Sequence, residues 1–286
     1  MKKYMEAGSK KSINLNNYRE NIYHKAGLKE CPHYSEDGVI LKIFDEIAIN
    51  NNPLIIEFGE HRALGTTTRA FRIKYNSKAI YFSGNLGFKS YILNVIDIFK
   101  ISFKKSFIYL KFLFNLPFKY YVTPENIIEL FKRKKVKEID ILTIDIDSFD
   151  YYVAKKILEE NYKPKLLILE YNPSLGYEER ITFPVTFSEK SKPNNKRVYG
   201  CSFKAFEALA GKYKYSLIHI SGFCNLFYIQ NKFAHIFKRP NLKNELIKSN
   251  KDVLLFINKF CQKGFVPSWF NSPELNSEQL KFFDKL

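Results

Sequence analysis

The sequence lacks the cysteine patterns that bind zinc or that stabilise small secreted proteins. Its four cysteines are Cys31, Cys201, Cys224 and Cys261, and no two of them form a CxxC pair. This spacing indicates neither a zinc site nor a disulfide framework. Reduced thiols are the simplest interpretation, and they favour a cytoplasmic protein.

Long apolar segments are also missing. No stretch approaches the roughly 18 uncharged residues of a membrane-spanning helix, and the first eleven residues lack the apolar core of a signal peptide. We therefore expect a cytoplasmic chain without a membrane span. A peripheral position at the inner face of the membrane stays open, because basic amphipathic segments can contact anionic lipid.

Acidic residues are strongly outnumbered. The chain has 46 lysines and arginines against 29 aspartates and glutamates, for a formal net charge of +17. This predicts attraction to anionic partners, such as lipid or phosphorylated sugars and nucleotides. A general lysine bias with a solvated basic surface is the favoured interpretation, and a functional patch is the alternative. Because no nucleic-acid-binding motif is recognisable, we do not expect nucleic acid as the partner.

The chain does contain enough apolar material for a sizeable core. Of its 286 residues, 45% are hydrophobic and 16% are aromatic, which suits one α/β domain with additional segments. Residues 1–32 are interpreted as a polar, loosely attached lead-in, and residues 33–232 as the main domain. Residues 233–286 are interpreted as a basic helical tail. We find no internal repeat or low-complexity linker that indicates a second domain.

Apolar runs alternate with helical patterns throughout the main domain, which predicts a mostly parallel sheet with helices on both faces. We expect strands at residues 54–59, 79–82, 118–122, 139–146, 166–169, 215–220 and 225–229. The last two strands are too close for a parallel crossover, so they should form an antiparallel hairpin. Residues 173–199 show little strand or helix character, as lids and substrate-facing loops often do.

The basic excess is greatest between residues 73 and 120, where eight lysines accompany a single acid. Apolar residues recur there at three- and four-residue steps, namely Ile92, Ile96, Phe99, Phe103, Phe107, Leu110 and Phe114. This spacing predicts a basic amphipathic helical segment over residues 88–116. Its apolar side would cover the sheet, which is the favoured interpretation, or lie on an anionic membrane surface.

Two apolar runs end in polar residues. Asp145 and Asp147 follow one run, and Glu170 and Asn172 follow the next, about twenty-five residues later. If both runs are parallel strands, their carboxyl ends share one edge of the sheet, where open α/β sheets bind ligands. Asp145 and Asp147 stand two apart, so they face the same side wherever the extended conformation continues.

These residues suggest two kinds of chemistry. Asp145, Asp147 and Glu170 are the candidate catalytic residues, because a carboxylate there can accept a proton as a general base. Asp147, Glu170 and Asn172 are the alternative, as oxygen ligands of a divalent cation such as Mg²⁺. A purely structural interpretation is equally open, in which Asp145 and Asp150 cap the following helix.

Several short motifs occur in the order found in a known superfamily. They include Ile56-Glu57-Phe58-Gly59, Thr123-Pro124-Glu125-Asn126, Ile144-Asp145-Ile146-Asp147 and Leu169-Glu170-Tyr171-Asn172. Over about residues 33–232, the chain resembles a bacterial branch of the class I S-adenosylmethionine-dependent methyltransferases, related to the FkbM-like sugar methyltransferases. The resemblance implies a doubly wound, Rossmann-like α/β fold. It also implies O-methylation of a sugar hydroxyl in a surface polysaccharide or its nucleotide-linked precursor.

The resemblance further implies a cofactor site. Glu57 and Gly59 occupy the turn after the first strand, where glycine lets the backbone approach S-adenosylmethionine. Asn85 stands where an acid commonly binds both ribose hydroxyls, and Glu125 and Asn126 complete the implied set. Asn85 is no carboxylate, and bulky or charged residues replace the further glycines after Gly59. The alternative is therefore a degenerate methyltransferase-like domain without cofactor, acting as a scaffold or regulator.

Overall fold

The computed structural model describes most of the main domain and short pieces near both ends of the chain. The described residues are 12–19, 36–50, 52–59, 66–84, 92, 95, 96, 98, 99, 118–176, 178–185, 199–221, 224–246, 280, 281 and 283–286.

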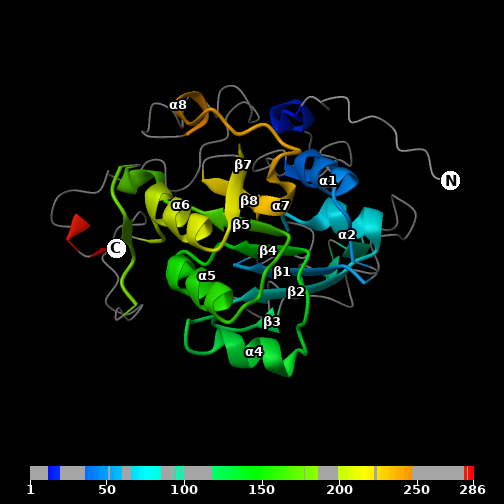
Figure 1. Cartoon of the computed structure of the whole chain (residues 1–286). Helices are drawn as coiled ribbons and strands as arrows, with labels where there is room; N and C mark the ends of the chain where they lie inside the picture. Colours follow the sequence, from blue (N-terminus) through cyan, green and yellow to red (C-terminus); the bar gives the residue numbers. More distant parts are fainter. Residues whose placement is uncertain are drawn as a thin grey trace.

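A seven-stranded sheet forms the centre of the molecule (Figure 1). Its strands are β1 (Leu54–Phe58), β2 (Lys78–Ser83), β3 (Phe118–Lys119), β4 (Ile141–Ile144), β5 (Leu166–Glu170), β7 (Tyr215–Ser221) and β8 (Asn225–Gln230). Their order is β3-β2-β1-β4-β5-β8-β7, and only the pairings that β8 makes with β5 and β7 are antiparallel. This arrangement, as in the methyltransferase fold, confirms the predicted fold class and hairpin.

Helices cover both faces of the sheet, because successive strand residues point to opposite sides. Ile55 belongs to the core beneath α1 (Glu36–Glu46) and α2 (Arg69–Tyr75). Ile56 belongs to the core beneath three helices, namely α4 (Ile127–Arg133), α5 (Asp150–Glu159) and α6 (Phe203–Lys212). Figure 1 shows the two groups of helices on opposite sides of the strands. Burial on both faces explains the nearly continuous apolar sequences of the central strands.

Part of the amino-terminal lead-in packs against the main domain, contrary to the expected loose attachment. A short 3-10 helix, η1 (Leu15–Tyr18), buries Leu15 against α1. Ile13 forms a parallel bridge with Phe237, and Arg19 donates a 2.7 Å hydrogen bond to the carbonyl oxygen of Ile220. Local sequence patterns did not indicate the last two contacts, because their partners lie more than two hundred residues away along the chain.

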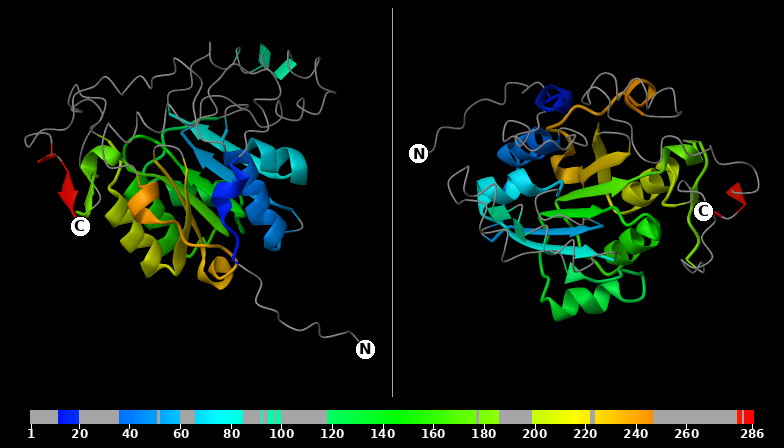
Figure 2. Two further views of the ribbon diagram at one scale, coloured as in Figure 1. Left: turned by 90° about the horizontal axis from the view of Figure 1, so that it is seen from above. Right: turned by 180° about the vertical axis from the view of Figure 1, so that it is seen from behind.

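The segment expected to be irregular contains regular structure. Residues 173–199 include η4 (Pro173–Leu175) and β6 (Ile181–Thr182). β6 pairs antiparallel with β9 (Asp284–Lys285), and both views of Figure 2 show β9 away from the main sheet. The predicted helical tail is therefore partly wrong at its end. Its described helices, α7 (Asn231–Ala234) and α8 (Leu242–Glu245), have four residues each, and residues 247–279 lie outside the described ranges.

The predicted amphipathic segment over residues 88–116 is described at five positions, and all of them are helical. Ile92, Ile96 and Phe99 are exposed at 42%, 39% and 42%, whereas Ile98 is buried. The predicted apolar stripe is thus solvent-exposed here, which corrects the favoured interpretation at these positions. Periodicity identifies residues that share a face, but not the side on which packing occurs. Among the described residues, no helix is long and apolar enough to cross a membrane.

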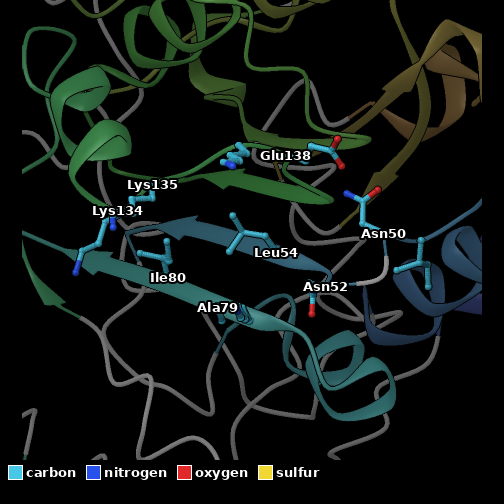
Figure 3. Close-up of a pocket in the computed structure, with 11 residues that line it drawn as sticks. Asn50, Asn52, Leu54, Ala79, Ile80, Lys134, Lys135 and Glu138 are labelled. Carbon is cyan, nitrogen blue, oxygen red and sulfur yellow. The ribbon is translucent and has the colours of Figure 1, made fainter.

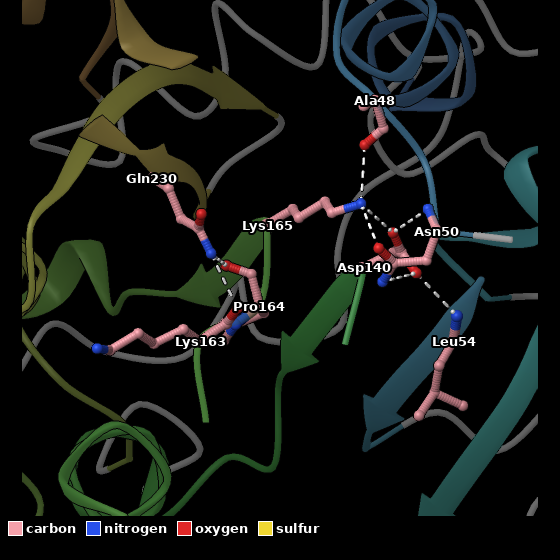
Figure 4. Close-up of polar contacts among 8 residues, drawn as sticks. All are labelled: Ala48, Asn50, Leu54, Asp140, Lys163, Pro164, Lys165 and Gln230. Carbon is pink, nitrogen blue, oxygen red and sulfur yellow. Dashed lines mark hydrogen bonds and ion pairs between the residues drawn. The ribbon is translucent and has the colours of Figure 1, made fainter. Parts of the chain in front are cut away.

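A buried carboxylate joins the beginnings of three strands (Figure 4). Asp140, just before β4, accepts hydrogen bonds from the backbone N–H of Leu54 (3.0 Å) and from the Asn50 amide (3.1 Å). The Lys165 ammonium, just before β5, lies 3.0 Å from the same carboxylate. It also donates to the carbonyl oxygen of Ala48. These contacts satisfy the buried charge and hold the amino ends of β1, β4 and β5 together.

Replacing Lys165 by methionine should lower the free energy of unfolding by about 3 kcal/mol, because the buried Asp140 charge loses its counter-ion. Urea unfolding measures the change. Lys163→Met is the matched control: Lys163 is exposed two residues earlier (Figure 4). The control should change the free energy of unfolding by less than about 0.5 kcal/mol. Equal effects of the two substitutions would contradict a stabilising role for the ion pair.

Candidate functional site

The candidate site lies at the carboxyl ends of β4 and β5. β4 ends at Ile144, and the chain leaves the extended conformation at Asp145. Asp147 has a φ of 54°, in the left-handed region that aspartate adopts more readily than most residues. The sequence suggested that Asp145 and Asp147 share one face of a strand. They do not, because the strand ends before them. A turn, rather than continued extension, brings their side chains together.

Three carboxylates converge at this turn. Asp145, Asp147 and Glu170 each offer an oxygen, and these oxygens lie within 4.8 Å of one another. Asp147 is exposed, whereas Asp145 and Glu170 are half-buried. The three predicted catalytic residues are thus neighbours in space, and their catalytic role stays a prediction.

The surroundings of this cluster favour partial protonation. Burial among protein atoms raises the pKa of Asp145 well above its usual range, and the Glu170 charge adds to the shift. Burial raises the pKa of Glu170 to about 7, and the Asp147 charge adds to that shift. A hydrogen bond between the two side chains favours a protonated Asp145 beside an ionised Glu170. The pair therefore holds a proton near neutral pH.

Asp150 stabilises the turn. Its two carboxylate oxygens accept hydrogen bonds from the backbone N–H groups of Ile146 and Ser148, each 2.9 Å long. Burial raises its pKa to about 6. The structural role that the sequence suggested for two aspartates thus belongs to Asp150. The side chain of Asp145 instead forms a hydrogen bond with that of Glu170.

Two buried residues beside Glu170 were not predicted from the sequence. Cys224 donates a hydrogen bond from Sγ to Glu170 Oε1 at 2.9 Å, because the β5–β8 register pairs Glu170 with the adjacent Asn225. Tyr199 is buried, and the Glu170 charge helps to raise the pKa of its hydroxyl well above the usual range. The pairing of β8 with β5, which the predicted hairpin alone does not give, places Cys224 there. No local pattern marks Tyr199, which is close to Glu170 only in the folded chain.

The side chain of Asn172 is bound within the chain at both polar ends, and its predicted role as a metal ligand stays a prediction. Its buried side chain accepts a hydrogen bond from Ser174 N and donates one to the carbonyl oxygen of Tyr199, both 2.9 Å long. Both polar ends of the amide therefore tie the two ends of the 173–199 segment together. A hard cation at this edge would find oxygen ligands in Asp145, Asp147 and Glu170.

The end of β1 and the turn after it contain two residues of the implied cofactor site. Gly59 has a φ of 104°, and a Cβ there would lie 1.4 Å from the carbonyl oxygen of Asp145. Only glycine fits, so this turn lies directly against the turn after β4. Glu57 is buried and accepts hydrogen bonds from Thr67 N (2.9 Å) and Thr68 Oγ1 (2.7 Å). Glu57 therefore anchors the segment that leads into α2.

The other three residues of the implied cofactor site differ in their surroundings. Asn85 lies outside the described residues. Asn126 accepts a hydrogen bond from Thr123 N (2.9 Å) and donates one to the carbonyl oxygen of Tyr121 (2.8 Å). It thereby forms the turn before α4. Glu125 is exposed in the same turn and stays a candidate ligand.

No protein-family model matches the chain, and no curated protein sequence is significantly similar to it. The mostly parallel sheet is compatible with a Rossmann-like fold. The resemblance to sugar methyltransferases therefore rests on the motifs and on the strand order.

The protonated acid pair predicts a pH-dependent stability. An acid whose pKa is raised on folding stabilises the folded state below its unfolded pKa, and this contribution is lost as the pH rises through the folded pKa. Asp145→Asn preserves the size of the side chain and removes one acid. Between about pH 5 and about pH 8, the free energy of unfolding should fall by about 1–2 kcal/mol less in the variant than in the wild type. This figure is reduced to take account of the partial exposure of the side chain. Urea unfolding at both pH values measures this difference.

Glu159→Gln is the control for this experiment, because Glu159 is an exposed acid at the opposite end of α5. It should lose stability with pH as the wild type does. Identical pH dependence in Asp145→Asn and Glu159→Gln would show that the acid pair holds no proton near neutral pH.

Proposed function

We propose that the chain is an S-adenosylmethionine-dependent O-methyltransferase acting on a sugar hydroxyl in a surface polysaccharide or its nucleotide-linked precursor. The observation that carries this proposal is the acid pair Asp145 and Glu170 at the carboxyl ends of β4 and β5. The surrounding sheet has the strand order of the methyltransferase fold. A proton acceptor at this edge stands where sheets of this type bind ligands.

The described residues fit the cofactor in two respects. S-adenosylmethionine would supply an electrophilic methyl group on a positively charged sulfur. Gly59 presents only backbone at the end of β1, beside the turn after β4. The carboxylates of Asp147 and Glu170 provide negative charge at the same edge, which favours a cationic ligand there.

Glu170 is suited to remove the proton of the acceptor hydroxyl. With a pKa of about 7, its carboxylate is a stronger base than an ordinary glutamate, and about half of it is ionised at neutral pH. When the bound cofactor supplies the methyl group, Glu170 would accept the proton that the acceptor hydroxyl gives up, so charge is balanced. The hydrogen bond from Cys224 orients Glu170 for this role.

Magnesium would give the same proposal a second form. The oxygens of Asp145, Asp147 and Glu170 suit a hard divalent cation in type and spacing. Such an ion lowers the pKa of a hydroxyl bound to it, and the three carboxylates would hold it against the acceptor. Loss of activity on chelation would distinguish this form from direct proton transfer to Glu170.

Charge and exposure support the proposed acceptor and location. The net charge of +17 favours an anionic acceptor, such as a nucleotide-linked sugar. We propose a cytoplasmic location. The exposed Ile92, Ile96 and Phe99 within the basic segment support a peripheral contact with anionic membrane.

One observation favours a second candidate, a scaffold or regulator without cofactor. Glu57, Asn126 and Asn172 were expected at ligand sites, and each uses its side chain to bind another part of the chain. A degenerate domain would keep such structural contacts after losing the ligand.

Calorimetric titration with S-adenosylhomocysteine, with and without magnesium, tests the proposal first. We expect a dissociation constant in the micromolar range, because the β1 and β4 turns form one edge at which such a ligand can bind. Absence of binding in both conditions would favour the scaffold. Methyl transfer to any acceptor would exclude it.

With a sugar acceptor in hand, Glu170→Gln should lower kcat by about 100-fold or more and leave KM nearly unchanged, since the proton acceptor is lost. The wild-type rate should rise with pH through about 7 as Glu170 loses its proton. The residual activity of the variant should lack this rise. Glu207→Gln, at an exposed acid on α6, is the control. An unchanged kcat in Glu170→Gln would exclude it as the base.

A further inference from the structure

A cleft of about 1030 Å³ lies at the opposite end of the sheet from the acid pair (Figure 3). It opens beside Leu54 and Lys78, the first residues of β1 and β2. Because β1, β2, β4 and β5 are parallel, the strand length separates this cleft from the acid pair, by roughly 15 Å. The cleft shares no lining residue with the candidate methyltransferase site.

Lysines dominate the charge of the cleft. Its lining includes Lys78, Lys134, Lys135 and Lys137, with Glu138 as the single acid among the described lining residues. Within the described ranges, no ion pair involves Lys78, Lys135 or Lys137. The nearby Asp140 is already paired with Lys165 (Figure 4). Among the described lining residues, lysines thus outnumber the single acid, and the cleft carries net positive charge.

The remaining lining is uncharged. Figure 3 shows Leu54 and Ile80 between two groups of polar residues. The loop with Lys134 and Lys135, called the lysine loop, lies on one side, and Asn50 and Asn52 lie on the other. Leu54 and Ile80 are half-buried, and Asn52 is exposed. A ligand that fills the cleft would thus carry anionic groups at one end and an uncharged, partly apolar group at the other.

The walls of the cleft are held by contacts within the chain. The Asn50 amide donates to Asp140 (3.1 Å) and accepts from Lys165 (2.8 Å). The lysine loop after α4 turns at Lys135, whose φ is 52°, and Val136 N bonds to the carbonyl oxygen of Phe131 (2.9 Å). A ligand therefore meets ordered walls, which reduces the entropy lost on binding.

We propose that this cleft binds a diphosphate-bearing ligand of the nucleoside diphosphate class. Several ammonium groups on one wall suit the clustered charges of a diphosphate. The apolar floor and the Asn52 amide suit a nucleoside, which offers ring faces and hydrogen-bonding edges. The volume of about 1030 Å³ is close to that of small-molecule sites.

Calorimetric titration with uridine diphosphate tests the proposal, because this probe lacks the adenine of the proposed methyl donor. Inorganic pyrophosphate and uridine are titrated in parallel. We expect uridine diphosphate to bind more tightly than pyrophosphate, and uridine to show no measurable binding. The triple variant Lys78→Gln, Lys135→Gln and Lys137→Gln should weaken binding at least about tenfold, through lost charge-assisted contacts.

A second triple variant controls for general charge. It combines Lys212→Gln, Lys214→Gln and Lys232→Gln. It removes three positive charges, as the cleft variant does, but near the other edge of the sheet, and all three residues are exposed. Lys214 also matches the left-handed conformation of Lys135, with a φ of 63°. This control should bind uridine diphosphate as the wild type does.

Each result decides the proposal. Loss of binding in the cleft variant alone supports it, whereas equal affinities for pyrophosphate and uridine diphosphate would overturn it, because the nucleoside would then contribute nothing. No binding by the wild type, or equal weakening in both triple variants, would overturn it. Glu170→Gln should bind uridine diphosphate normally. A loss there, with normal binding by the cleft variant, would move the nucleotide to the acid pair and also overturn the proposal.

Discussion

The position of β4 between β1 and β5 is the constraint on which the rest of the structure depends. Its parallel register sets Ile144 beside Phe58 and Leu169, so the turns that follow these strands meet at one edge. Gly59 lies against the backbone of Asp145 for this reason. At the other edge, the same pairing brings together the beginnings of the three strands, where one buried carboxylate joins them. Both candidate sites are consequences of this register.

The acid pair and the Asp140 network illustrate two uses of a buried carboxylate. Asp140 has a counter-ion and backbone donors, so its charge supports the fold. Burial instead raises the pKa of both Asp145 and Glu170, which costs stability at neutral pH. Groups with such perturbed pKa values gather at functional sites more often than elsewhere. This contrast is the physical basis for placing chemistry at the carboxyl end of the sheet.

Charge is divided between the two ends of the strands. The carboxyl end carries three neighbouring carboxylates, which suit a cationic ligand or a metal ion. The amino end of β1 and β2 carries a group of lysines around a cleft, which suits clustered phosphates. The excess of basic residues is therefore more than a uniform property of the surface, since local arrangement gives each end its own preference for ligands.

The sequence was sufficient to predict the fold class and the antiparallel hairpin. It also predicted that Asp145 and Glu170 lie close together. These predictions depend on periodicity and on the general behaviour of parallel strands, which are local or topological properties. Partner choice was less accessible: the contacts of Asn172 and Tyr199 join residues far apart along the chain, and the β6–β9 pairing joins still more distant segments. Periodicity also did not show that Ile92 would be exposed.

By itself, the sequence determined which residue types stand at the strand ends and in what order the elements occur. The tertiary structure decided which of those side chains are already bound within the protein and which meet in space. It also decided where the lysines gather, because residues 78 and 134–137 become neighbours only when β2 and the segment before β4 reach the same edge of the sheet. Local propensity acts between near neighbours in the chain, whereas burial, pairing and charge depend on distances that exist only after folding.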